Sequence, residues 1–277
     1  MNLKPLLIIS AIVLAIPNFI PRDINEQLSY NQAERYHPVL AEINSIDKLE
    51  KYVDDEAAIK KIDIHTPQYP LLLAYFISCR FYHGFSHWKL SENWIAAVGE
   101  KVTGIGLSCK VKPDDIMKHP DAACSQQALV MMEILKRKKI DYRKVGFPHH
   151  YALEVKVQDR WYYFDPNMEP KMNLTQRIHE NWNGDNDLLK QYYDSAKHHN
   201  LSYQFGDKQK AAFGTINEIP AQRLKLFQDT TSILSKIAWC FPLILLFATK
   251  RSRQTKAITS PRKRSFFKGI KPVLSAG

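Results

Sequence analysis

The sequence predicts an α+β protein with helices in its first half, a pair of strands near its centre and a hydrophobic helix at each end. Three observations carry this prediction: apolar residues with a helical period after residue 45, strict alternation over residues 151–157, and apolar runs near both termini. The apolar content of 45% and the charged content of 24% are ordinary for globular proteins, so disordered, collagen-like and disulfide-scaffold classes are excluded.

The first 22 residues predict an N-terminal membrane anchor or a signal peptide. Residues 5–20 carry no charge and follow Lys4. Because no clear pair of small residues marks a cleavage site, an uncleaved anchor is favoured over a cleaved signal peptide.

A second apolar stretch predicts a transmembrane helix at residues 231–249. Its length is near the lower limit for crossing a bilayer, and Lys236 is close enough to the start to reach the interface. A buried amphipathic helix is the alternative.

The net charge of +11 is concentrated at the C-terminus. Residues 250–277 contain nine basic residues and no acid, whereas the rest of the chain is nearly neutral. The positive-inside rule then places both ends in the cytoplasm and residues 23–230 outside it, which predicts a cell-membrane location. Nucleic acid is not an expected partner, because the tail offers only Phe266 and Phe267 for stacking and no known binding module.

Residues 23–230 are expected to form one domain. A helix capped by Ser45 places Ile46, Leu49 and Val53 on one face. Residues 69–79 are apolar all round but too short to cross a bilayer, which predicts a buried core helix. A short helix is expected from Ser91.

A further helix is predicted to begin near Asp121 and to end in four basic residues at 136–139. Cys124 then lies in its first turn, where unpaired backbone amides and the helix dipole favour the thiolate. Taken alone, a cysteine at a helix start is more often structural, since free cysteines are usually buried.

Two strands are expected next, at residues 148–157 and 161–165, joined by a turn at Asp159–Arg160. His150 falls on the strand face that carries Ala152 and Glu154, which is expected to open to a cleft or solvent. Asp165 shares that face, but this register sets it opposite Glu154, so a bulge or a wider turn is needed to bring it to His150.

Thiol, imidazole and carboxylate in this order form a nucleophile, a base and an orienting group. The blocks Ala122-Ala-Cys124-Ser-Gln-Gln127, His150-x-x-x-Glu154-Val155 and Trp161-x-x-x-Asp165-Pro166 resemble the signature blocks of the transglutaminase-like superfamily. The resemblance covers about residues 90–170. It implies a papain-like core at about residues 70–170, in which a nucleophile helix packs on an antiparallel sheet, and acyl transfer by catalytic Cys124, His150 and Asp165.

Two residues depart from the superfamily pattern. Ala122 stands where many members have glycine, and Ala152 replaces an aromatic residue, which affects the turn at the nucleophile and a wall of the cleft. The Cys124 backbone N–H is the expected first oxyanion donor. Trp94 is either a second donor or a core residue, and Gln126 and Gln127 are either cleft residues or simple helix formers.

No cofactor or metal is expected. His83 and His87 have the spacing of two ligands on one helical turn, but Gly84 and Ser86 disfavour a helix and no third ligand is near in sequence. Cys79 and Cys109 are either paired in an oxidising compartment or buried as free thiols.

Two functions from different classes fit these observations. The first is a membrane-anchored cysteine enzyme, a hydrolase or acyltransferase acting on an amide in a protein, peptide or wall material. The second is a non-catalytic transglutaminase-like module that binds or assembles parts of the cell envelope. The presence of all three catalytic residue types favours the enzyme. The oligomeric state is left open.

Overall fold

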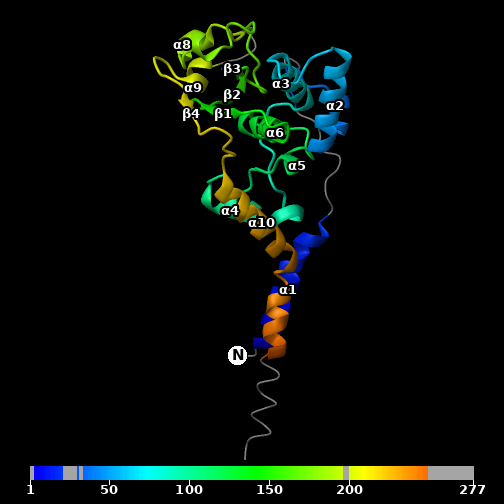
Figure 1. Cartoon of the computed structure of the whole chain (residues 1–277). Coiled ribbons are helices and arrows are strands. Elements are labelled where there is room, and N and C mark those ends of the chain that lie inside the picture. The colour runs from blue at the N-terminus through cyan, green and yellow to red at the C-terminus, as the bar shows by residue number, and fades with distance from the viewer. Residues whose placement is uncertain (1–2, 21–29, 31–33, 196–199, 249–277) are drawn as a thin grey trace, which may run out of the picture. The chain divides into compact units, whose positions relative to one another are not determined.

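The computed structural model describes residues 3–20, 30, 34–195 and 200–248 (Figure 1). The predicted basic tail at 250–277 lies outside these residues. The chain divides into two compact units: Ile20–Ser235 form the larger, and Met1–Phe19 with Lys236–Gly277 form the smaller. The larger unit is mixed α+β with one small antiparallel sheet.

The smaller unit brings together the first and last helices that the structure describes. It contains α1 (Leu3–Ala15), the short helix η1 (Ile16–Phe19) and a helix at Cys240–Ala248, which Figure 1 shows side by side in blue and orange. Apolar side chains are exposed on both helices, among them Ile9, Ile12, Ile244 and Phe247.

Among the described residues, no single helix is both long and apolar enough to cross a membrane. The helix predicted at 231–249 is not continuous, because α10 (Gln222–Ile237) ends before a break and a new helix starts at Cys240. Taken together as a bent pair, these two helices meet the length and hydropathy requirement.

The helical half of the larger unit follows the periodicity of the sequence. Ser45 caps the second helix by accepting a hydrogen bond from the Lys48 N–H, and Ile46, Leu49 and Val53 are buried as expected. The helices are η2 (Pro38–Glu42), α2 (Ile46–Ile59), α3 (Gln68–Arg80), α4 (Leu90–Thr103), α5 (Pro113–Ile116) and α6 (Cys124–Arg137). Helix α3 is the buried core helix predicted at 69–79.

The sheet has four antiparallel strands in the order β3-β2-β1-β4, and α6 packs on β1 and β2. The strands are β1 (Tyr142–Gly146), β2 (Tyr151–Val157), β3 (Arg160–Phe164) and β4 (Ala212–Phe213). β1 and β4 were not foreseen. β1 is short, and β4 comes from a segment 66 residues further along that only pairs with it in the folded chain.

The turn between β2 and β3 lies one residue earlier than predicted. It comprises Gln158 and Asp159, both with positive φ of 49° and 63°, and it pairs Val157 with Arg160. Two positive-φ residues match the right-handed twist of a hairpin. Each β3 residue is therefore shifted two positions along β2, and the extended register sets Asp165 opposite Ala152 instead of Glu154.

Both faces of β2 are buried, which corrects the expectation that one face opens to a cleft or solvent. Leu153 and Val155 contact the α2, α3 and α6 core, whereas Ala152 belongs to a second core on the other face. The second core is built from the chain after β3, including α7 (His179–Trp182), α8 (Asn186–Lys190) and α9 (Leu201–Phe205). The sequences of these short helices show no clear helical periodicity, so it could not be predicted that they cover the second face of the sheet.

Candidate functional site

Cys124 is the first residue of α6, three residues later than the predicted helix start. Its position in the first turn is as expected. The preceding segment is fixed to the core, because Ala122 N–H donates to the Tyr82 carbonyl at 3.0 Å. Cys124 as a whole is half-buried.

His150 lies in the loop between β1 and β2, one residue before β2 begins. The loop is closed by a hydrogen bond of 3.0 Å from the Phe147 N–H to the His150 carbonyl. The imidazole is surrounded by Phe147 and Phe205, whose ring centroids lie 6.1 and 5.1 Å away, and the residue is only 5% exposed. The base is therefore buried, not solvent-facing.

Asp165 directly follows β3 and meets His150 without a bulge. In the observed register the two residues are diagonal neighbours on one face, a spacing that longer side chains bridge. His150 Nε2 and Asp165 Oδ2 are 2.6 Å apart. The one-residue shift of the turn is what removes the misfit expected from the sequence.

Further donors hold the Asp165 carboxylate in place. Oδ1 accepts from the N–H groups of Asn167 at 3.1 Å and Met168 at 2.9 Å, and Oδ2 also accepts from the Tyr193 hydroxyl at 2.7 Å. Tyr193 is itself bonded to the Tyr163 hydroxyl at 2.8 Å. Sequence patterns gave no signal for Tyr193, because it lies 28 residues after Asp165.

The electrostatics favour an ionised pair. Burial lowers the pKa of the His150 imidazole, but the Asp165 carboxylate and the Cys124 thiol, both hydrogen-bond partners of the ring, outweigh burial and raise it to about 10. Burial also raises the pKa of Asp165, but the His150 charge and the bonds to His150, Met168 and Tyr193 lower it overall. Since Asp165 occupies Nε2, Nδ1 is the ring nitrogen left for Cys124.

These shifts define the pH range in which the pair stabilises the fold. The contribution of His150 is complete below its unfolded pKa of about 6.5 and is lost as pH rises through about 10. The contribution of Asp165 is present above its unfolded pKa of about 3.9 and is lost as pH falls through the lowered folded pKa. Both contributions are complete between about pH 4 and 6.5, and at neutral pH that of His150 is only slightly reduced.

Gln126 fixes the start of the nucleophile helix. Its carbonyl accepts from the N–H groups of Ser86 and Ala123 at 2.9 and 3.2 Å, and its amide donates to the carbonyls of Ser86 and Lys110 at 2.9 and 2.8 Å. Gln127 makes one such bond, to the Ala122 carbonyl at 2.8 Å. Both residues are buried structural supports and not cleft residues.

Trp94 is not placed to act as an oxyanion donor. Its indole N–H donates to the Ser235 carbonyl at 3.0 Å, which joins α4 to α10. Asn93 on the same helix bonds Thr231 and Ser235, both at 3.0 Å. The Cys124 backbone N–H stays the expected first donor.

The cysteines and histidines outside this site do not form the pairs that the sequence analysis considered. Among the described residues all four cysteines are free thiols, including Cys79 and Cys109. His83 is exposed, and its backbone N–H donates to Glu34. His87 instead lies beside Glu100 and Cys109, which form the one group in the described parts of the chain with ligand atoms close enough for a metal ion.

No family model, no curated protein and no solved structure matches the chain.

Proposed function

We propose that the chain is a membrane-anchored cysteine enzyme of transglutaminase-like type, which transfers or hydrolyses the acyl group of an amide in a protein, peptide or wall polymer. The observation that supports this proposal is the contact of a helix-start thiol with an imidazole whose other nitrogen bonds a buried carboxylate. Cys124 acts as nucleophile, His150 as general acid and base, and Asp165 as the orienting group.

The reaction follows from the positions of these groups. In the reactive pair the proton of Cys124 resides on His150, and the thiolate adds to the amide carbonyl carbon. The tetrahedral intermediate collapses when His150 protonates the departing amine, which leaves a thioester on Cys124. Water or a second amine then attacks the thioester, with His150 accepting its proton, and restores the thiol.

The folding pattern is consistent with a papain-like core, which we propose as the finer fold class. Helix α6 presents the cysteine at its first residue, packs on β1 and β2, and faces a histidine and an aspartate at the ends of β2 and β3. This is the arrangement that the resemblance to transglutaminase-like proteins implies.

Alkylation by iodoacetamide tests the nucleophile on the full chain. Burial raises the pKa of Cys79, and burial together with the Glu100 charge raises that of Cys109 to about 11, so both are largely protonated at mildly acidic pH. Cys124 is half-buried at the first residue of α6 and lies beside the His150 imidazole, the base of the proposed reaction. We expect Cys124 to react at least about tenfold faster than the other two, as read by peptide mass spectrometry.

His150→Gln is the matched control for this labelling, since it removes the titratable ring and keeps a hydrogen-bond donor near Asp165. The preference for Cys124 should then disappear. Equal rates for Cys79, Cys109 and Cys124 in the unmodified chain, or reaction of Cys124 only after denaturation, would contradict the proposed nucleophile.

We further propose that the helices of the smaller unit anchor the protein in the membrane, with residues 23–230 outside the cytoplasm. The exposed apolar side chains of α1 and of Cys240–Ala248 support this proposal, and so does the basic tail beyond them. Protease added to intact cells is expected to digest the larger unit and to spare an epitope attached after Gly277. Digestion of the epitope with protection of the larger unit would mean the opposite orientation.

A further inference from the structure

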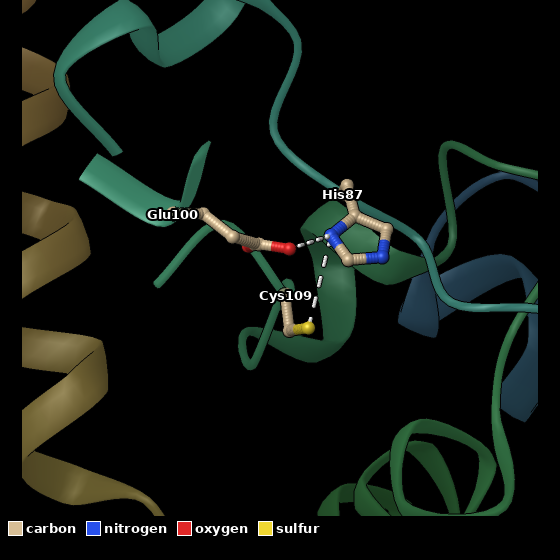
Figure 2. A group of neighbouring side chains, drawn as sticks. All are labelled: His87, Glu100 and Cys109. Atoms are coloured by element: carbon tan, nitrogen blue, oxygen red, sulfur yellow. Dashed lines mark hydrogen bonds and ion pairs between the residues drawn. The ribbon is translucent and has the colours of Figure 1, made fainter. Parts of the chain in front are cut away.

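His87, Glu100 and Cys109 form a cluster that the proposed reaction does not use (Figure 2). His87 Nδ1 lies 3.3 Å from Glu100 Oε1 and 3.7 Å from Cys109 Sγ, and all three ligand atoms lie within 4.8 Å of one another. The three residue types are an imidazole, a carboxylate and a thiol, which are the ligands that Zn²⁺ takes in proteins.

The cluster is not a second catalytic triad. In such a triad the carboxylate and the thiol bond opposite nitrogens of the imidazole, as Asp165 and Cys124 do at His150. At His87 both groups face the same nitrogen, Nδ1, as Figure 2 shows. Groups that converge on one point suit a shared ion better than a proton relay.

The spacing fits a tetrahedral zinc ion. Bonds of about 2.0 Å to nitrogen and oxygen and about 2.3 Å to sulfur, at tetrahedral angles, separate N from O by about 3.3 Å and N from S by about 3.5 Å. The observed separations are 3.3 and 3.7 Å. These two separations are within a few tenths of an ångström of the values around zinc, and Glu100 and Cys109, whose ligand atoms lie within 4.8 Å, would close to about 3.5 Å. An ion at Nδ1 would also displace the Ser108 hydroxyl, which lies 2.9 Å from that nitrogen.

The backbone holds the ligands in place before any ion binds. His87 and Cys109 are direct partners in an antiparallel bridge, flanked by hydrogen bonds from Trp88 N–H to Ser108 O at 2.8 Å and from Lys110 N–H to Ser86 O at 2.9 Å. Glu100 reaches this bridge from the last turns of α4. Rigid supports of this kind favour metal affinity.

The second oxygen of Glu100 is also fixed. Oε2 accepts from the Ser108 N–H at 2.7 Å and from the Ser108 hydroxyl, which leaves Oε1 directed at His87. Hydrogen-bonded carboxylates of this type are usual among metal ligands. The His87 side chain is 40% exposed, so an ion has a path to the cluster.

We propose that His87, Glu100 and Cys109 bind one zinc-like divalent transition-metal ion, with the fourth coordination position taken by water. Hard ions such as Mg²⁺ and Ca²⁺ are disfavoured by the thiol. The ion would join α4 to the two segments of the bridge. It would also brace the start of α6, because Ser86, the neighbour of His87, bonds Gln126 through its N–H and carbonyl.

The test titrates Co²⁺, as a coloured substitute for Zn²⁺, into the full chain in detergent with Cys124→Ala as background. This background matters, since the Cys124 thiol and His150 are a second pair of metal-binding side chains. We expect one Co²⁺ per chain and a sulfur-to-cobalt absorption band, which is lost in Cys109→Ser and weakened at least about tenfold in affinity in Glu100→Gln. His83→Gln, four residues before His87 and outside the cluster, is the matched control and should bind as the background does.

Two measurements keep the proposal testable if a variant fails to fold. Zn²⁺ at about 100 times its Kd should raise the melting temperature of the Cys124→Ala chain by about 5 to 10 °C. Zn²⁺ should also protect Cys109, and not Cys79, from iodoacetamide. A cobalt spectrum without a thiolate band, an equal band in Cys109→Ser, or unchanged labelling of Cys109 would overturn the proposal, and each outcome is independent of amide turnover.

Discussion

Replacing Cys124 with alanine is expected to abolish amide turnover, with a loss on the order of 10⁶-fold, and His150→Ala should lose as much because the two act as one unit. The reason is that the thiol alone, without a base at Nδ1, neither forms the thiolate efficiently nor protonates the leaving amine. The measurement is release of amine from peptide amides by the full chain. Asp165→Asn should cost less, on the order of 10⁴-fold, since nucleophile and base survive while the orientation of the ring is lost.

His149→Ala is the matched control for the histidine, because His149 is exposed and stacks on Tyr203 at a centroid distance of 3.9 Å. It should keep turnover. Full biological activity of the Cys124→Ala chain would contradict the proposal of an enzyme. It would favour the alternative of a non-catalytic binding module.

Thermal melts must accompany these assays. The sequence patterns place none of the three residues on the apolar face of its element, which predicts little change in stability for all three variants. The structure corrects this: His150→Ala leaves the Asp165 carboxylate buried without its positive partner, a change that costs about 3 to 5 kcal/mol. His150→Gln separates loss of the base from loss of the fold.

Gln126→Ala is expected to lower the free energy of unfolding by about 3 kcal/mol, or about 6 to 12 °C in melting temperature. The side chain satisfies two backbone N–H groups, of Ser86 and Ala123, and donates to the carbonyls of Ser86 and Lys110. Alanine leaves buried polar groups without partners at the start of α6. Denaturant unfolding measures the loss, and iodoacetamide labelling should show slower reaction of Cys124 in the surviving folded fraction.

Gln127→Ala gives the comparison on the next residue of the same helix. It removes one hydrogen bond, to the Ala122 carbonyl, and its own carbonyl oxygen has no partner to lose among the described residues. We expect a cost of about 1 kcal/mol. Equal losses of unfolding free energy from the two substitutions would mean that the additional hydrogen bonds of Gln126 do not stabilise the fold.

The sequence predicted those features best that are determined within a single helix or strand. Ser45 and the buried positions of α2 follow from capping and helical period, and Cys124 in the first turn of α6 follows from the same reasoning. The prediction that the strand face of His150 opens to a cleft or solvent was wrong, because Trp182, Phe205 and other residues from the short helices after the strands cover that face. Whether a strand face is buried depends on other segments of the chain, and the residue alternation within the strand carries no information about them.

The distance between Asp165 and His150 depended on the position of the turn between the two strands. The position of such a turn is decided by the dihedral angles of one or two residues. Asp159–Arg160 and Gln158–Asp159 are both polar pairs without glycine, so composition does not separate them. Tyr193 and the His87 cluster were missed for another reason. Their partners lie between 9 and 30 residues apart, at spacings that match no local motif.

The length of the turn at Gln158–Asp159 determines where Asp165 lies relative to His150 at the other end of the hairpin. Exposed hairpin tips usually accept insertions. Here one added residue would turn Asp165 to the opposite face of the sheet, and two would restore the face but displace the carboxylate by about 7 Å along the strand. Either change breaks the 2.6 Å contact with His150. Functional chains of this design should therefore vary in length elsewhere on the surface and keep a connection of two residues at this tip.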